Sequence, residues 1–145
     1  MMPNTYRRIA LAGAITVSAA LAPGTASATP ASGVSAVTIS QTTVGGRDYI
    51  LREITIQPGG STGWHYHDGT LHAVVEQGTL THTESDCTTT ATYGKDAFFI
   101  EHSGSSNVHI GRNLGRAPVV LDVLYVDPVG SPLSESVLNP GCDFQ

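Results

Sequence analysis

The stretch that decides the fold is GGSTGWHYH, residues 59–67, in which one residue separates His65 from His67. Successive side chains of a β-strand point to opposite faces, so two histidines at this spacing share a face if the segment is extended. Neutral imidazole is the usual protein ligand of zinc, iron, copper and nickel. Two imidazoles do not complete a metal site, so a further ligand must come from another part of the chain.

The sequence on either side of this stretch predicts an all-β protein. Beyond residue 28 no segment keeps a helical apolar period over several turns, whereas short runs rich in Val, Ile, Thr and Tyr alternate with Gly and Pro. We expect strands at residues 34–43, 49–57, 71–77, 79–83, 87–93, 97–100, 107–112 and 118–126. Many short strands at such spacing are typical of a sandwich or a closed barrel.

Two motifs together resemble the cupin family. The first is residues 59–67, continued by EQG at residues 76–78, and the second runs from Gly94 through FFI at residues 98–100 to HIGRN at residues 109–113. The resemblance covers residues 48–126 and implies a single-domain antiparallel jelly-roll β-barrel with a metal near its middle. It makes His109 the third imidazole beside His65 and His67. The side chains that we expect to shape an apolar substrate pocket are Leu71, Ala73, Val75, Phe98, Phe99, Leu121 and Tyr125.

The chain departs from the family pattern where a glutamate ligand is expected. Counting back from Gly78 places that ligand at Leu71, which cannot bind a metal, and the next residue is His72. Alternation with the apolar residues at 73 and 75 predicts that Leu71 points into the barrel and His72 points out. However, Asp68-Gly69 is a bulge signal, and a slip of one residue there would exchange the two faces. His72 is therefore kept as a candidate fourth ligand.

Without a carboxylate, three neutral imidazoles would leave the full charge of the ion in place and favour anionic ligands. We expect one divalent transition metal, drawn from Fe, Mn, Zn, Ni and Cu. The carboxylates of Glu76 and Glu101 are assigned no role, and His82 and His102 are interpreted as ordinary surface or core histidines. Catalytic residues stay unassigned at this stage.

The N-terminal segment has the order of a secretory signal peptide. Arg7-Arg8 precedes an uncharged apolar run at residues 9–22, and Ala26-Ser27-Ala28 predicts cleavage after Ala28. The run is shorter than the roughly 20 residues of a membrane-spanning helix, which disfavours an uncleaved anchor and stable membrane insertion. We therefore expect residues 1–28 to be a signal peptide, 29–46 an arm and first strand, 47–128 the barrel and 129–145 a tail.

The charge and the cysteine content of the chain bear on its binding partners and on a disulfide. The chain has seven basic and twelve acidic residues, so no basic surface for nucleic acid is expected. Its two cysteines, Cys87 and Cys142, predict a disulfide that ties the tail to the barrel in an exported protein. Two free thiols are the alternative, and the absence of a C-x-x-C motif argues against a cysteine metal site.

These features predict a secreted cupin-type protein with a small-molecule ligand or substrate. The sequence does not decide between a monomer and a homodimer. The resemblance implies a metal-dependent enzyme with oxygenase-type chemistry. The alternatives are a secreted protein that holds a metal or a small ligand without turnover, and a barrel used for adhesion whose histidines are vestigial.

Overall fold

The computed structural model describes residues 27–145, so the predicted signal peptide falls almost wholly outside the described residues. Ten strands and no helix make up the described chain, which confirms the all-β prediction. The strands are β1 (Ser32–Val44), β2 (Arg47–Ser61), β3 (His65–Tyr66), β4 (Thr70–Gln77), β5 (Thr79–Glu84), β6 (Thr90–Gly94), β7 (Phe98–Glu101), β8 (His109–Arg112), β9 (Val119–Pro128) and β10 (Glu135–Ser136).

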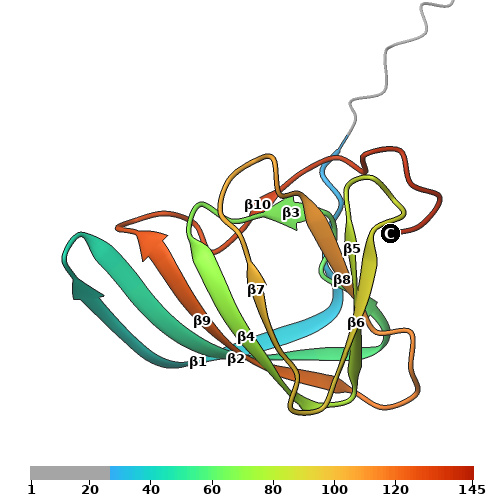
Figure 1. Ribbon diagram of the computed structural model, residues 1–145, viewed down its shortest axis with the longest axis horizontal. Helices are drawn as coiled ribbons and strands as arrows, with labels where there is room; N and C mark the ends of the chain where they lie inside the picture. The colour runs from blue at the N-terminus through green and yellow to red at the C-terminus, as the bar shows by residue number, and fades with distance from the viewer. Residues whose placement is uncertain (1–26) are drawn as a thin grey trace, which may run out of the picture.

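The strands form one continuous antiparallel sheet that curls into a jelly-roll barrel, and its two facing halves are called here the larger and the smaller sheet (Figure 1). The larger sheet has the order β1-β2-β9-β4-β7, and the smaller one contains β10, β3, β8, β5 and β6. The two are joined where the end of β2 pairs with β8, at Ser61 and Arg112. Among residues 27–145, no helix has the length and apolarity needed to cross a membrane.

Strand β2 continues past the point at which the sequence predicts its end. Pro58-Gly59-Gly60 does not stop the strand but bends it from one sheet into the other. Gly59 adopts a positive φ of 76°, and a Cβ on Gly60 would lie 2.8 Å from the carbonyl oxygen of Gln57. Glycines in strands often mark such barrel corners, because a side chain would block the close approach of the backbone. The bend delivers His65 to the rim of the smaller sheet.

Alternation along the strands separates the barrel interior from its outer face. On β4, Leu71, Ala73 and Val75 are buried, and on β9 the same is true of Leu121 and Val123. These side chains pack with Ile50, Ile56, Leu80, Phe99, Val119 and Tyr125 into one core cluster. Since apolar burial is the main stabilising term in folding, this pattern sets which face of each strand can carry a functional group.

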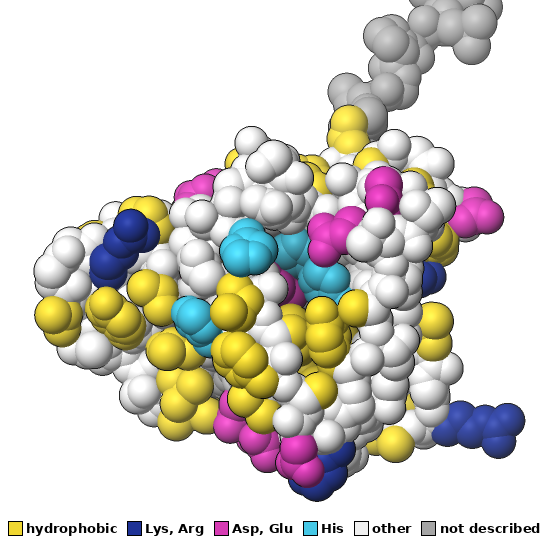
Figure 2. All heavy atoms as spheres, in the orientation of Figure 1, with side chains coloured by type: hydrophobic (Ala, Val, Ile, Leu, Met, Phe, Trp, Pro, Cys, Tyr) yellow, Lys and Arg dark blue, Asp and Glu magenta, His cyan; other side chains and the backbone are white. Residues whose placement is uncertain are grey.

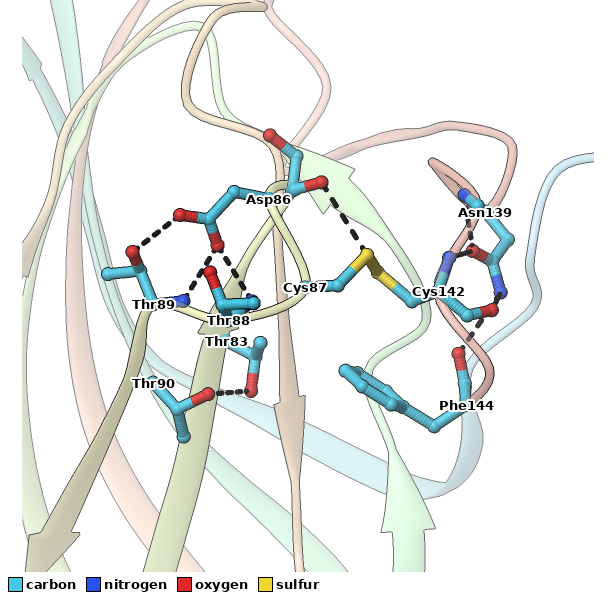
Figure 3. The surroundings of a disulfide bond; sticks show 11 residues. Thr83, Asp86, Cys87, Thr88, Thr89, Thr90, Asn139, Cys142 and Phe144 are labelled. Atoms are coloured by element: carbon cyan, nitrogen blue, oxygen red, sulfur yellow. Dashed lines mark hydrogen bonds between the residues drawn. A yellow bond between two sulfur atoms is a disulfide. The ribbon is translucent and has the colours of Figure 1, made fainter.

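The tail is held against the smaller sheet by covalent and aromatic contacts. A disulfide joins Cys87, in the turn after β5, to Cys142, as the cysteine count predicts (Figure 3). The Phe144 ring stacks on buried Trp64 at a centroid distance of 5.9 Å, and the Arg112 guanidinium lies over the same Phe144 ring, 3.7 Å from its centroid. The short strand β10 pairs with β3. These contacts brace the segment that carries His65 and His67.

Candidate metal centre

Four ligand side chains converge inside one end of the barrel. His65 lies on β3 and His67 follows it, while His109 comes from β8 and Glu101 from β7. One ligand atom from each residue lies within 4.8 Å of all the others. His65 and His109 face each other directly across the β3–β8 pair. Figure 2 shows histidine side chains gathered at a hollow near the middle of one face of the molecule.

Each of the three histidines is oriented by a backbone carbonyl. The Nδ1 atoms of His65, His67 and His109 lie 2.9, 2.7 and 2.8 Å from the carbonyl oxygens of Gly63, Leu133 and Asn107. A carbonyl only accepts hydrogen bonds, so in each ring Nδ1 carries a proton and donates it. The Nε2 lone pair of each neutral imidazole is then available. Metal-binding histidines almost always show this arrangement, which sets the tautomer and the ring direction.

The convergence of these atoms suits a cation. The Nε2 atoms of His67 and His109 are buried without a hydrogen-bond partner. Both atoms lie close to the same oxygen of Glu101, at 3.0 and 3.4 Å from Oε2. Buried polar atoms are normally paired, so this group of unpartnered nitrogens beside a carboxylate calls for a positive ion. Ligand atoms bound at about 2.1 Å to one ion lie roughly 3–4 Å apart, so only small movements would be needed.

Glu101 supplies the carboxylate that the cupin pattern leads one to expect at position 71. In the β4–β7 ladder, Leu71 and Glu101 are direct partners. Directly opposed residues of neighbouring strands point to the same face, so both side chains enter the barrel side by side. Leu71 is 2% exposed and packs in the core, and Glu101 reaches the histidines. The sequence predicted three imidazoles with no carboxylate to offset the charge of a divalent ion. The structure instead brings three imidazoles and one carboxylate together.

Burial and charge act in opposite directions on the ionisable groups of this cluster. Burial, followed by the charges of His109 and His67, lowers the pKa of His65 to about 3. Burial alone would raise the pKa of Glu101, but the charge of His109 and the neighbouring imidazoles hold it well below its usual range. Burial also opposes protonation of His109, yet the carboxylate of Glu101 outweighs this effect and raises the pKa of His109. The carboxylate of Glu101 and the imidazole of His109 thus favour each other's charged forms, and a metal that binds Nε2 would take the place of a proton there.

The other predicted site residues divide between the cavity and the outer face. Leu71, Ala73, Phe99, Leu121 and Tyr125 line a cavity beside the cluster, and Val75 is fully buried in the core. By contrast, Phe98 is 58% exposed because it alternates with inward-facing Phe99 on β7. His72 also lies on the outer face, where its ring stacks on Phe98 at a centroid distance of 6.1 Å. The bulge signal at Asp68-Gly69 does not exchange the faces of β4, and His72 is not part of the cluster.

His82 is a cluster neighbour that sequence reasoning missed. It is buried on β5, its Nε2 lies 3.3 Å from Oε1 of Glu101, and its ring stacks on that of His109 at 4.7 Å. Its inward direction matches the alternation with Leu80, which is also buried. That alternation was the available signal, but a single histidine on a strand does not reveal what it faces across the barrel. Glu101 thus has imidazoles on both carboxylate oxygens.

Comparison with known proteins finds one matching family and several solved structures with a similar fold. The model of the cupin domain family matches residues 52–126. The polyketide cyclase RemF from Streptomyces resistomycificus is similar in structure, with a TM-score of 0.62 and 19% identity over 86% of this chain and 90% of that chain. A conserved protein with a double-stranded β-helix domain from Klebsiella pneumoniae has a TM-score of 0.57 and 17% identity over 72% of this chain and 84% of its own. The Cupin_2 domain of an XRE family transcriptional regulator from Enterobacter cloacae has a TM-score of 0.55 and 18% identity, covering 65% of this chain and 96% of that one. No match was found among curated proteins.

Proposed function

This chain belongs to the cupin family, and on that premise we propose that it binds one divalent transition metal through His65, His67, His109 and Glu101 and acts on a small organic molecule. The observation that carries the proposal is the shared orientation of the three imidazoles. Each ring donates a hydrogen bond from Nδ1 to a backbone carbonyl, and the three rings gather around the carboxylate of Glu101. Metal-binding histidines almost always donate the other ring N–H to such a partner, which fixes the ring.

Three imidazoles and one carboxylate suit Fe, Mn, Zn, Ni or Cu. The carboxylate of Glu101 would offset part of the charge of the bound ion. When bound, the metal would supply Lewis acidity and, for a redox-active ion, a site for reaction with oxygen. We propose oxygen-dependent oxidation of the organic molecule as the reaction.

The protein side chains around the cluster would exclude water and orient the bound molecule. The cavity wall beside the cluster includes Leu71, Phe99 and Leu121, whose apolar surfaces favour an apolar ligand. Burial, followed by the charge of Glu101, raises the pKa of Tyr125 to about 12. The Tyr125 hydroxyl therefore stays protonated at neutral pH and is able to donate a hydrogen bond to a bound molecule.

We also propose that the protein is exported and cleaved after Ala28. The disulfide between Cys87 and Cys142 supports this, because disulfides persist mainly in oxidising compartments. Expression of the full chain in a bacterial host, followed by mass measurement of the protein recovered outside the cytoplasm, tests the proposal. A product that begins at Thr29 is expected, and a product that retains residues 1–28 would refute cleavage there.

Elemental analysis of the purified protein tests the metal site. We expect about one ion per chain in the native protein and little in His65→Ala, because loss of one imidazole opens the site. The matched control is His102→Ala, which removes an exposed histidine and should leave the metal content unchanged. Equal metal content in native protein and His65→Ala would refute the assignment.

Oxygen uptake by the metal-loaded protein tests the reaction. A panel of small phenols and thiols should contain compounds that raise the rate of oxygen consumption over that of the metal-free protein. Metal and ligand binding without oxygen uptake would instead favour the non-catalytic alternative, a secreted protein that holds a metal and a small molecule.

A further inference from the structure

Arg52 is a cation at the mouth of the barrel that the proposed metal centre does not use. It lies on β2 between Ile50 and Ile54 in the inward-facing series, opposite Val123 of β9. The mouth that it lines also includes His65, His67 and Tyr125. Its guanidinium is near enough to the Tyr125 hydroxyl to oppose the rise in the pKa of that group. Arg52 therefore stands on the path between solvent and the metal centre.

No acidic side chain of residues 27–145 neutralises Arg52. The five close contacts between basic and acidic side chains in this part of the chain involve His67, His82, His109 and Lys95, and none involves Arg52. The Nε atom of Arg52 is buried and has no hydrogen-bond partner. A guanidinium offers five donors in a planar fork and stays charged at any physiological pH. Apart from its contact with the Tyr125 hydroxyl, the half-buried guanidinium of Arg52 has no ion-pair partner among residues 27–145, so it is free to bind an anionic group that enters the mouth.

The space around Arg52 limits the size and character of that partner. The mouth has a volume of about 150 Å³ and continues past His65 and His67 into a narrower space of about 50 Å³ beside Glu101. A cavity of about 150 Å³ accommodates a benzene ring in an engineered protein. The walls nearest Arg52 include Val34, Ala36 and Ile54, which are apolar. The occupant is therefore a small molecule with an apolar body and one anionic group.

We propose that Arg52 binds the carboxylate of a small apolar monocarboxylic acid, whose body extends from the mouth toward the metal centre. This inference rests on the proposed function and names the substrate class of the same site. A carboxylate matches the planar fork of a guanidinium in a bidentate pair, and the protonated Tyr125 hydroxyl beside it offers a further donor. Glu101 already provides an anion to the metal centre, so a second anionic group is better placed at Arg52 than deep among the histidines.

Calorimetric titration with benzoate and with benzamide, its neutral analogue, tests the proposal. The metal-loaded protein should bind benzoate at least about tenfold more tightly than benzamide, since a hydrogen-bonded charge pair is worth a factor of this order or more. Arg52→Gln should lose that preference and leave benzamide binding unchanged. Arg52→Lys, which keeps the charge but not the fork, should be intermediate. The matched control is Arg47→Gln, an exposed arginine on the same strand, which should behave as the native protein.

Two results would overturn the inference. One is a native protein that binds benzoate no more tightly than benzamide, and the other is an Arg52→Gln variant that keeps the native preference, which would place the carboxylate on the metal. Metal content measured on the same samples separates this inference from the proposed function. If the native protein holds its full metal content but does not prefer benzoate, the role of Arg52 alone is refuted. If the native protein holds no metal, the metal centre itself is refuted.

Discussion

Exchanging the residues at positions 71 and 101 tests whether the carboxylate of the metal centre can be moved by one strand. Leu71 and Glu101 are opposed in the β4–β7 ladder, and both point into the barrel. Glu101→Leu should remove the carboxylate, and the double variant Leu71→Glu with Glu101→Leu should return it from the neighbouring strand. We expect metal binding to be lost in the first variant and restored in the second.

The expected size of the effect follows from linkage between binding and folding. At a metal concentration of 100 times Kd, binding stabilises the native protein by about 2.7 kcal/mol. Loss of an outer-shell partner weakens metal binding by about 10- to 100-fold, and loss of a direct ligand should reach at least the upper figure. At the same concentration, Glu101→Leu would then gain only about 0.4 kcal/mol. For a domain of this size, the metal-induced rise in Tm should fall from roughly 10 °C to roughly 2 °C.

The assay is thermal unfolding with and without metal, followed by circular dichroism, together with elemental analysis of dialysed samples. Glu76→Leu is the matched control, because it removes an exposed carboxylate from the outer face of β4 and should keep the native rise in Tm. A native metal-induced rise in Glu101→Leu would refute the role of Glu101. A folded double variant that does not regain metal would show that the register of the ladder is not enough to place a ligand.

Three further predictions concern stability. Replacing both Cys87 and Cys142 by serine should lower the free energy of unfolding in urea by about 4 kcal/mol, because the disulfide closes a loop with a sequence separation of 55; a loss below about 1 kcal/mol would contradict this. Asn113→Ala should cost roughly 3 kcal/mol in the same assay, since its side chain bonds the backbone of Ile56, Ala117 and Gly115, while elemental analysis should find unchanged metal content. The pKa of His65 is lowered from 6.5 to about 3 in the folded protein, so its contribution to stability is complete above pH 6.5 and is lost as pH falls toward 3. Urea melts of the metal-free protein should therefore show a decline over this range that is smaller in His65→Leu, and equal declines would count against the burial argument.

The all-β prediction came from periodicity, and the structure confirms it because periodicity reports burial. Along β4 and β9, apolar residues at every second position are buried, and the intervening residues are more exposed. This pattern follows from the geometry of a single strand and needs no knowledge of its neighbours. The disulfide was predictable because two cysteines have only one way to pair within a chain. Strand β2 was cut short because Pro-Gly-Gly normally ends a strand, whereas here it turns a barrel corner.

The candidate site was only partly predictable because its members meet across strands. The spacing of His65 and His67 lies within one segment and could be read directly, and the motif that ends at Asn113 brought in His109. Glu101 and His82 lie on separate strands, and nothing in their local sequence indicates that both face His109. Which strands become neighbours is set by the whole barrel, including the lengths of its loops and the corner in β2.

The relation between positions 71 and 101 shows what alternation within one strand does and does not determine. Alternation places Leu71 inside, as the structure confirms, and the count back from Gly78 assigns the family's carboxylate position to that residue. From the sequence, a replacement ligand was sought only at the next residue of the same strand, His72. In an antiparallel ladder, two opposed inward positions occupy neighbouring places on the barrel wall, so either one can supply a ligand to the same point. When one strand of a barrel lacks an expected ligand, the residue directly opposite on the neighbouring strand is therefore the first place to look. The same geometry excludes His72, which follows Leu71 in sequence but points to the opposite face.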